Sequence, residues 1–416
     1  MDGGSRARTG DAAPIRWLLV AALVGLAARL AFGLGYWTDR PLTRDEQEYL
    51  SLARSLAAGH GFVYDDVLTS TGVEPFGRAP GYPGFLAIAG GGRDASPSVP
   101  ALVKVAQSVV GAFGVVMAGL IAHRLAGRRA AVFAAAGVAA YPPLVWISGY
   151  ALSEALFWPI GLLAAWLFDR ARAHPTHAGA ALLCGLVLGA GTLVRPALVV
   201  FLPLAAALLV ARRQPRPLAL IALGMFVIVA PWTARNYAHH GRLVFVASEG
   251  GVTFWTGNHP LAVGDGDMAA NMGIKLDNQR LRAEYPDVSE EDMEPVYYRE
   301  ALQWMREHPG DWLALQFRKV FYLVVPAGPS YTLHSTRYYV LSVVSYVPVL
   351  IVAIVAARRM RRDLPRLSGL WLLAASAVLV ALIFFPQERF RIPILDPSLV
   401  ILAGAGLAAS RRAGRS

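Results

Sequence analysis

The sequence predicts an all-α polytopic membrane protein, a bundle of about 10 (10–12) transmembrane helices with large loops on one side. Composition is the first reason: 55% of the 416 residues are hydrophobic and 16% are charged, against about 25% charged in a soluble domain. The mean hydropathy of +0.44 is the second, because one soluble core cannot hide that much apolar surface. Third, the apolar residues form separate runs near the ~20 residues that cross a ~30 Å hydrocarbon core.

These apolar runs are the candidate spans. The run at 197–211 is short, so we expect it to be tilted or partly interfacial. The break Tyr141-Pro142-Pro143 leaves the turn between the third and fourth runs open, because proline disrupts a helix interior. In chain order the spans are 17–37, 101–122, 131–150, 151–168, 179–196, 197–211, 217–235, 337–356, 367–386 and 394–410.

Basic clusters orient the bundle. Pairs such as Arg128-Arg129 and Arg358-Arg359 fall in short loops on the side of the N-terminus, which the positive-inside rule assigns to the cytoplasm. An even number of spans returns the C-terminus to that side. The expected organisation is a cytoplasmic N-terminus (1–16), a transmembrane domain (17–410) with outer loops at about 38–100 and 236–336, and a cytoplasmic C-terminus (411–416).

The apolar segment 312–334 leaves one choice in this topology. An eleventh span there would move the last basic cluster outside, so an interfacial helix is the preferred interpretation, with a span or a re-entrant helix left open. At the N-terminus, a basic lead before Trp17 is similar to the start of a signal peptide. The long apolar run and the many spans after it favour an uncleaved first span instead.

Charge and cysteine content narrow the function. The net charge of +11 lies in short clusters between apolar runs, where arginines set topology and meet anionic lipid headgroups, so we expect no nucleic-acid partner. The single cysteine, Cys184, excludes an internal disulfide and a cysteine metal site. An excess of Arg, Ala and Gly over Lys indicates a GC-rich genome, and from it a bacterial plasma membrane.

The first outer loop opens with a helix that carries two acids. Thr43 suits the N-cap and Glu46 the N3 position of a capping box, and Leu50 begins an apolar side that predicts an amphipathic helix on the outer membrane surface. Asp45 and Glu46 then have two interpretations. They favour the helix N-terminus electrostatically, or one of them is a general base for an acceptor hydroxyl near the headgroups.

Further polar residues gather at the outer ends of the spans. Arg78 lies in a loop stiffened by prolines and either suits a phosphate or snorkels. Glu154 is expensive at membrane depth and therefore marks a functional site or a buried pair. Asn258 lies among glycines and aromatics that suit a carbohydrate or a packed turn. Arginines at further outer ends, each an anchor if taken alone, indicate together a polar cavity; they are Arg195, Arg235, Arg389 and Arg391.

These residues, in their order along the chain, resemble the GT-C glycosyltransferases that use polyprenyl-phosphate sugars, in particular the protein O-mannosyltransferase and aminoarabinose transferase type. The resemblance covers roughly residues 15–410 and rests on the order and the membrane side of short motifs. From the first outer loop to the last outer turn they are Asp45-Glu46 with Tyr49, Arg78-Ala79-Pro80, Ser153-Glu154, Arg195-Pro196, Pro231-Trp232 with Arg235-Asn236, Gly257-Asn258, His308-Pro309, and Arg389-Phe390 with Pro393.

The resemblance implies a membrane enzyme that transfers one sugar, with inversion, from a polyprenyl-phosphate carrier to a hydroxyl of a glycan, lipid or protein outside the cytoplasm. The catalytic base maps onto Asp45, with Glu46 and Glu154 as further catalytic candidates. Arg78 maps onto the contact with the donor phosphate. The other expected substrate-binding residues are Tyr82, Arg195, Arg235, Asn258, Arg389 and Arg391. The chain departs from the family at Ala79, where the family has proline, and at Phe390, where it has tyrosine.

Two further questions stay open at this point. No residue pattern demands a metal or another cofactor, although a divalent cation fits the chemistry that the resemblance implies. The main alternative function is a multi-span transporter or flippase, and a membrane scaffold is the third. A transporter would be expected to show internal repeats and charges near the midplane, whereas here the ionisable groups gather at one face.

Overall fold

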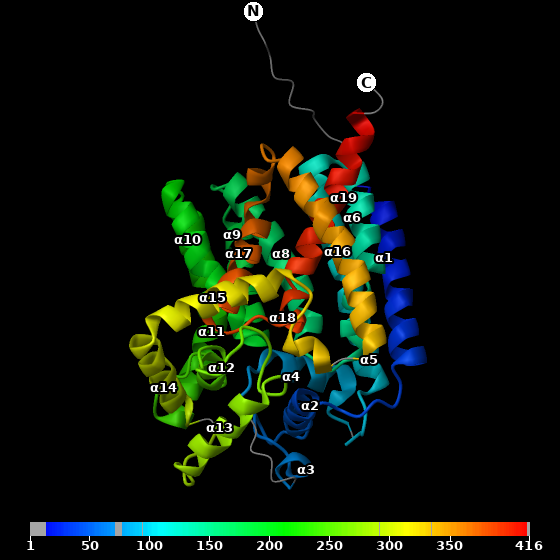
Figure 1. Cartoon of the computed structure of the whole chain (residues 1–416). Helices are drawn as coiled ribbons and strands as arrows, with labels where there is room; N and C mark the ends of the chain where they lie inside the picture. Colours follow the sequence, from blue (N-terminus) through cyan, green and yellow to red (C-terminus); the bar gives the residue numbers. More distant parts are fainter. Residues whose placement is uncertain (1–13, 71–76, 94, 291, 334, 414–416) are drawn as a thin grey trace, which may run out of the picture.

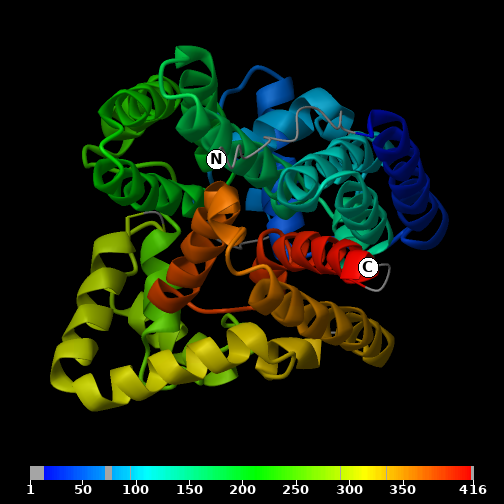
Figure 2. The same ribbon diagram turned by 90° about the horizontal axis from the view of Figure 1, so that it is seen from above.

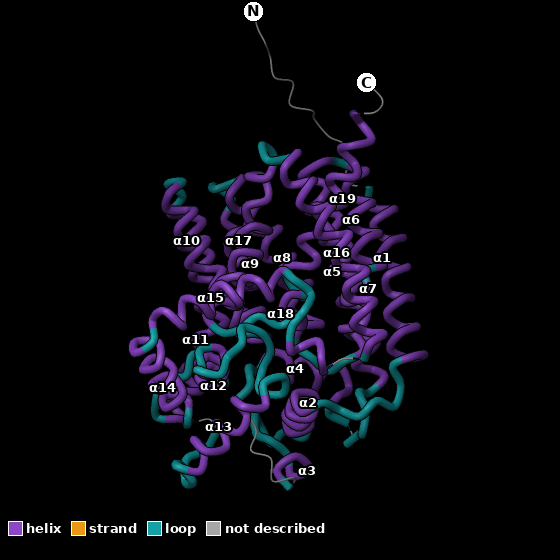
Figure 3. The backbone as a smooth tube through the Cα atoms, viewed as in Figure 1, coloured by secondary structure: helices purple, strands orange, loops and turns teal. Residues whose placement is uncertain are grey.

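The structure is a computed structural model that describes residues 14–70, 77–93, 95–290, 292–333 and 335–413. Within these ranges every regular element is helical, which confirms the all-α prediction (Figure 3). Most of the predicted cytoplasmic N-terminus and the last residues of the predicted cytoplasmic C-terminus lie outside the described residues.

Each predicted span coincides with a helix of the bundle, and most of these helices run roughly side by side (Figure 1). The described ones are α1 (Ile15–Leu30) continued by η1 (Ala31–Tyr36), α5 (Ala101–Ala126), α6 (Arg128–Ala140), α8 (Glu154–Ala173), α9 (Ala178–Val194), α10 (Phe201–Ala211), α11 (Pro215–His240), α16 (Thr336–Arg359), α17 (Ser368–Ile383) and α19 (Leu395–Ala413). Viewed from above, α1, α5, α6, α19 and α16 pack together, and α8 joins them to α9 and α11 (Figure 2).

Fewer helices meet the length and composition expected of a membrane span than the bundle contains. In the described part of the chain, 5 helices are long and apolar enough to cross a membrane: α1 with η1, α5, α11, α16, and α17 with the turn before it. The pair α6 and α7 (Pro142–Trp146, extended to Gly149) adds a sixth if its 62° bend is a broken span. This bend falls at the predicted proline break. The protein is a multi-pass membrane protein, and the number of ten spans stays a prediction.

Small residues let neighbouring helices approach closely. A Cβ on Gly185 of α9 would lie 2.2 Å from the carbonyl oxygen of Ile221 in α11, and one on Gly224 of α11 would lie 2.6 Å from that of Leu182. Two glycines facing each other across a helix pair remove the side chains that would hold the backbones apart. The same mechanism is common in membrane bundles, where lipid provides no hydrophobic drive for association.

Two long segments cover one end of the bundle. The first contains α2 (Arg44–Ala57), α3 (Asp66–Thr69) and α4 (Gly81–Leu86), and the second contains α12 (Gly250–Gly257), α13 (Met272–Ala283), α14 (Glu294–Glu307) and α15 (Pro309–Val324). The beginning of α1 and the end of α19 lie at the opposite end, together with the turns that carry the arginine pairs (Figure 1). Helix α15 runs across the bundle, an arrangement that favours the interfacial interpretation of 312–334.

Helix α2 begins as the sequence predicts but packs differently. Thr43 and Glu46 form the capping box. However, the polar residues Glu48, Ser51 and Ser55 are buried as well as the apolar side, so α2 does not lie on a membrane surface with a solvated polar face. The reason is that α4 packs against it and charged partners from the outer segments cover its polar side, as Asp65 does through its hydrogen bond with Ser51.

Candidate active site

Short elements at the covered end of the bundle hold the candidate site. Asp45 lies in the first turn of α2, Glu154 begins α8, and Arg195 follows the last residue of α9. Arg389 belongs to α18 (Glu388–Arg391), a single turn between α17 and α19. Arg78 precedes α4. Because each residue stands at a helix end, all five side chains converge on one region although they are far apart in the sequence.

Asp45 is held by two arginines. Its Oδ1 accepts a hydrogen bond of 2.6 Å from Arg78 Nη2, and its Oδ2 accepts one of 2.6 Å from Arg389 Nη1. Burial alone would raise the pKa of Asp45, but the charges of Arg78 and Arg389 outweigh it and hold the pKa well below its usual range. The carboxylate is therefore ionised at neutral pH, and its side chain remains 26% exposed.

Glu154 is the second acid and is completely buried. Its Oε1 accepts hydrogen-bonding contacts of 2.6 Å from Arg389 Nε and from Arg195 Nη1. Arg389 thus joins Asp45 to Glu154 through two different nitrogens. The guanidinium of Arg195 also lies 4.6 Å from the ring of Phe390. Glu154 is therefore part of a buried ion pair that belongs to a larger charged cluster.

Arg78 contacts three carboxylates. Nε donates to Glu48 Oε2 at 2.6 Å and Nη1 donates to Glu249 Oε2 at 2.7 Å, in addition to the contact with Asp45. The side chain is 7% exposed. Arg78 is therefore not a snorkelling surface residue. A phosphate could reach this guanidinium only by displacing one of the carboxylates.

Glu48 and Glu249 are members of the site that sequence reasoning missed. Glu48 stands three residues after Asp45, so both lie on one face of α2, and this spacing was a usable signal. Glu249 stands just before α12 in a glycine-rich segment and carried no such signal. Burial raises the pKa of Glu249 above its ordinary value, although Arg78 opposes the shift.

The charges of the cluster nearly cancel. It contains four carboxylates, those of Asp45, Glu48, Glu154 and Glu249, and three guanidiniums, those of Arg78, Arg195 and Arg389. Arg44, at 2.9 Å from Glu48, adds a fourth cation at the rim. A buried ionic cluster tolerates burial only when its charges are compensated in this way. We call this group of residues the outer cluster.

A cavity of about 190 Å³ adjoins the outer cluster at Arg78. Its wall includes Arg235, whose guanidinium lies 4.9 Å from the ring of Trp232 and donates to Asn236 Oδ1 and the carbonyl of Phe62. Within the described ranges no carboxylate pairs with Arg235. Buried Ser248 is also among the lining residues, and its hydroxyl has no hydrogen-bond partner among the described residues. The cavity therefore offers the cation of Arg235 to a ligand.

Two further predicted site residues have local structural contacts. Glu46 uses both oxygens: Oε2 accepts from the backbone and hydroxyl of Thr43, and Oε1 accepts from Ala151 N at 2.9 Å. Glu46 therefore ties the start of α2 to the segment that leads into α8. Tyr82 is fully buried and donates its hydroxyl to Gln107 at 2.6 Å.

The structure also places Asn258 and Arg391 apart from the outer cluster. Asn258 donates to the carbonyls of Phe254 and Ile383 and accepts from Lys319 Nζ at 3.1 Å, so it fastens α12 to α15 and α17. This arrangement favours the packed-turn interpretation of that segment. Arg391 points into a second buried group, where Nε donates to Asp396 Oδ1 at 2.9 Å.

The acids of the site are arranged poorly for a metal ion. Arg389 occupies the space between Asp45 and Glu154, where a cation would otherwise bridge them. In the part of the chain that the structure describes, no group of three or more His, Cys, Asp or Glu side chains is placed to hold a metal.

The described part of the chain is an all-helical membrane bundle with a compensated cluster of acids and arginines at one end, and this cluster adjoins a polar cavity. No family model matches the sequence, and no curated protein matches it. The structure is similar to the oligosaccharyltransferase AglB from Archaeoglobus fulgidus, in complex with an inhibitory peptide and a dolichol-phosphate, with a TM-score of 0.58 and 17% identity over 96% of this chain. The apo form of that enzyme matches with the same TM-score and identity.

The chain spans about half the length of these oligosaccharyltransferase chains, 50% and 51%. A further similar structure is ArnT from Cupriavidus metallidurans bound to undecaprenyl phosphate, with a TM-score of 0.44 and 15% identity over 96% of this chain and 79% of that one. At these identities the likeness concerns the fold. The prediction of a GT-C-type fold is confirmed.

Proposed function

We propose that the protein is a glycosyltransferase that moves a single sugar from a polyprenyl-phosphate carrier to an acceptor hydroxyl at the outer face of the membrane. One observation carries the proposal: Arg389 joins Asp45 to Glu154 at the loop-covered end of a GT-C bundle, beside a cavity that presents Arg235. The comparison with AglB supports it, because that enzyme was solved with a dolichol-phosphate.

The cavity fits the phosphate of the donor. Arg235 has no carboxylate partner in the described ranges, so a phosphate can form an ion pair with its guanidinium without breaking an existing one. Arg78 lies on the same cavity and can turn one donor toward the phosphate at the expense of a carboxylate. Charge-assisted hydrogen bonds of this type are stronger than neutral ones and keep their geometry.

Donor binding would also prepare the base. In the structure Asp45 is a weak base, because its pKa is held down by Arg78 and Arg389. When a phosphate engages Arg78, Asp45 loses part of this stabilisation and its pKa rises. Asp45 then accepts the proton of the acceptor hydroxyl while the acceptor oxygen bonds to the anomeric carbon. The bond between that carbon and the phosphate oxygen breaks, polyprenyl phosphate leaves with the electron pair, and the anomeric centre is inverted.

Glu154 has a positioning role in this scheme. It is completely buried and binds both Arg389 and Arg195, so it fixes the guanidinium that faces Asp45. The proposed mechanism uses no divalent cation, since Arg389 fills the space between Asp45 and Glu154. The oligosaccharyltransferase AglB has also been solved with Zn and sulfate, so a dependence on added metal is worth measuring.

The proposed location is a multi-pass protein of a bacterial plasma membrane with both termini in the cytoplasm. The arginine-rich turns lie at the end opposite the outer cluster, which supports this orientation (Figure 1). Tags near residues 70 and 270 should be accessible only from outside, and tags near 127, 214 and 360 only from the cytoplasm. Cytoplasmic labelling near 270 would contradict the proposed location of the site.

The direct test uses purified full-length protein in phosphatidylcholine vesicles. We expect consumption of a polyprenyl-phosphate sugar, release of polyprenyl phosphate, and a product that carries the sugar. The acceptor can be a glycan, a lipid or a protein, and mass spectrometry of envelope glycans from a deletion strain would identify it. Movement of the lipid-linked sugar across the vesicle membrane without its consumption would instead support the transporter or flippase alternative.

A further inference from the structure

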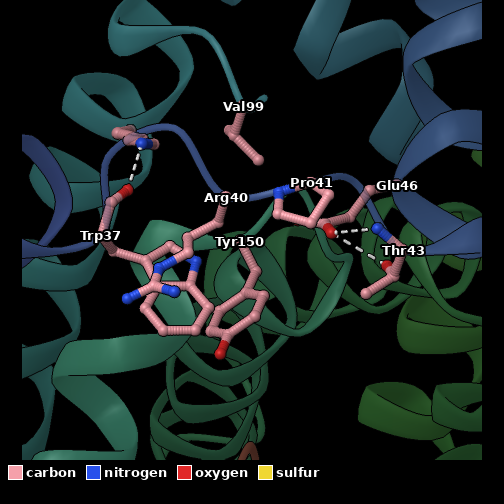
Figure 4. A pocket seen from close by; sticks show the side chains of 8 residues that line it. Trp37, Arg40, Pro41, Thr43, Glu46, Val99 and Tyr150 are labelled. Carbon is pink, nitrogen blue, oxygen red and sulfur yellow. Dashed lines mark hydrogen bonds between the residues drawn. The ribbon is translucent and has the colours of Figure 1, made fainter. Parts of the chain in front are cut away.

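A second pocket, of about 60 Å³, is lined by Thr43 and Glu46 at the start of α2 (Figure 4). Arg40, Trp37 and Tyr150 lie together at one side of it, and Glu46 lies at the other. The two cavities share no lining residue. This pocket is therefore separate from the proposed donor site.

Two cations line the second pocket with unused binding capacity. Lys104 is 5% exposed, and its Nζ donates to the backbone oxygen of Trp37 at 2.6 Å. An ammonium has three donors, so two remain for a ligand within the described structure. Arg40 is exposed at the rim, where its guanidinium lies 5.0 Å from the ring of Trp37. Among the described residues neither cation forms an ion pair with a carboxylate.

The acids near the pocket do not form ion pairs with these two cations. Asp39 and Glu46 act on Lys104 only through their charge at longer range. Both oxygens of Glu46 are occupied by Thr43 and by the backbone of Ala151. A small anion in the pocket would thus meet one buried ammonium and one exposed guanidinium, with aromatic walls around it.

The surroundings of the pocket are those of a lipid headgroup. Trp37 directly follows the span Ile15–Tyr36, and Lys104 lies in the first turn of the span Ala101–Ala126. Large aromatic side chains of this kind concentrate at the level of the headgroups. Near Trp37 and Lys104 in the sequence, Leu34 on the first span and Leu102 on the second span are about half exposed, at 42% and 50%. Acyl chains fit such a surface, whereas a free phosphate would not use it.

From these observations we propose that Arg40 and Lys104, with Trp37 and Tyr150 as aromatic walls, form a binding site for the phosphate headgroup of an anionic membrane phospholipid, whose acyl chains lie along the outer ends of the first span and of α5. The site does not depend on sugar transfer. Because Glu46 belongs both to the pocket and to the tie between α2 and α8, an occupied site would stabilise the loop that carries Asp45.

The test measures lipid retention by the purified full-length protein. Phosphatidylglycerol or phosphatidylcholine is titrated onto protein in neutral detergent, and bound lipid is counted by native mass spectrometry. We expect the parent to prefer phosphatidylglycerol and Arg40→Gln to weaken this binding about fivefold, as for one cation near an anionic headgroup. Lys104→Gln should weaken it further. Arg93→Gln is the matched control, because Arg93 is exposed and does not line the pocket.

Several outcomes would overturn the proposal. Equal binding of the two lipids would remove the headgroup charge from the explanation, and an equal loss in Arg93→Gln would indicate general surface attraction. Inorganic phosphate that displaces phosphatidylglycerol at similar concentration would identify a free-anion site. Undecaprenyl phosphate whose binding weakens in Arg40→Gln would assign the pocket to the donor. Loss of sugar transfer in phosphatidylcholine vesicles, with lipid binding intact, would contradict only the proposed function.

Discussion

Arg389 and Arg391 stand two residues apart on α18, yet they belong to opposite kinds of charged group. Arg389 lies in the outer cluster with Asp45, and their side chains are 27% and 26% exposed. Arg391 lies in what we call the inner cluster, with Asp396 and Glu388, where its side chain is 2% exposed and theirs are at most 1% exposed. The ring of Tyr346 stacks on Arg391 at 3.6 Å, and Tyr141 donates to Asp396 at 2.9 Å.

This difference in exposure distinguishes a ligand-binding site, the outer cluster, from a purely structural ion-pair group, the inner cluster. The inner cluster is closed, so its interactions can only hold α18 to α16, α19 and the bend before α7. The outer cluster can exchange a carboxylate for a ligand, because Asp45 and Glu249 remain partly exposed. A charged residue at the outer end of a span is therefore a functional candidate only when solvent can reach its partners. The experiments below test this distinction, from the largest expected effect to the smallest.

The largest effect is expected for Asp45→Asn. An amide retains the size of the side chain and can still serve at a helix start, but it accepts no proton at neutral pH. Sugar transfer should fall about 10²–10⁴-fold, the usual contribution of a general base. Yield, donor binding and transfer should be measured together. Near-parental transfer would make Asp45 a partner of the arginines alone, and Glu154 would be tested next.

Arg391→Leu should act on stability instead. It leaves Asp396 as an uncompensated buried charge, which costs about 3–5 kcal/mol. We expect a lower thermal midpoint and a lower detergent-solubilised yield. Donor affinity of the fraction that remains folded should match the parent. A selective loss of donor binding at full stability would break the comparison, because the inner cluster would then belong to the site.

Arg235→Gln should weaken binding of the donor by about 1.5–3 kcal/mol, the value of a hydrogen bond to a charged group. Folding should be unaffected, since Arg235 has no carboxylate to leave behind in the described structure. Arg78→Ala is the contrasting variant. It removes one cation from three carboxylates, of which Asp45 keeps Arg389 and Glu48 keeps Arg44. Glu249 keeps no ion-pair partner in the described structure, so the loss of donor binding should come with a loss of folded protein. Arg78→Lys should recover only part of the binding, because the fork of donors is lost.

A pH titration should distinguish the two clusters by sign. Burial raises the pKa of Glu388 from 4.5 to about 7, against the opposing charge of Arg391. The folded state therefore binds this proton more tightly than the unfolded state, and stability falls as pH rises from 5 to 7, by roughly 2 kcal/mol. Asp45 has a lowered pKa and loses stabilisation only in more acidic solution. Glu388→Gln should flatten the slope, and an unchanged slope would contradict the assignment.

The smallest effect is expected for Glu46→Gln. The amide oxygen can still accept hydrogen bonds, but only one of the two oxygens remains, so about 0.5–1.5 kcal/mol of stability should be lost. Transfer should decline less than in Asp45→Asn. An equal or larger loss of transfer at full stability would return Glu46 to the catalytic candidates. A matched comparison of thermal midpoints and rates decides between these outcomes.

The sequence predicted more of the fold than of the site, for a physical reason. Apolar runs of about 20 residues are a local property, and they located the helices of the bundle. Asp45, Arg78, Glu154, Arg195 and Arg389 were candidates from the sequence because ionisable residues at or near the ends of apolar spans stand out individually, and the structure brings these five together. Their pairing is not local: Arg389 meets Asp45 across more than 300 residues.

The positions of Asn258 and Arg391 were not predictable for the same reason. In the sequence each is polar and stands near the outer end of a span, like the members of the outer cluster. Their contacts with α15, α17 and Asp396, which place them apart from the outer cluster, depend on the packing of distant segments. The burial of the polar side of α2 was not predictable from the sequence for the same reason, because the residues that cover it come from segments distant in the sequence.

Helix α18 is one turn long, and its two arginines point into different charged clusters. Because Arg391 anchors α18 inside the bundle, the backbone of α18 is held in place, and Arg389 can respond to a ligand only by rotation of its side chain. New acceptor specificities can then evolve in the two outer segments while α18 and the site residues next to it keep their positions. For protein engineering, this makes residues 388–396 the segment to leave unchanged.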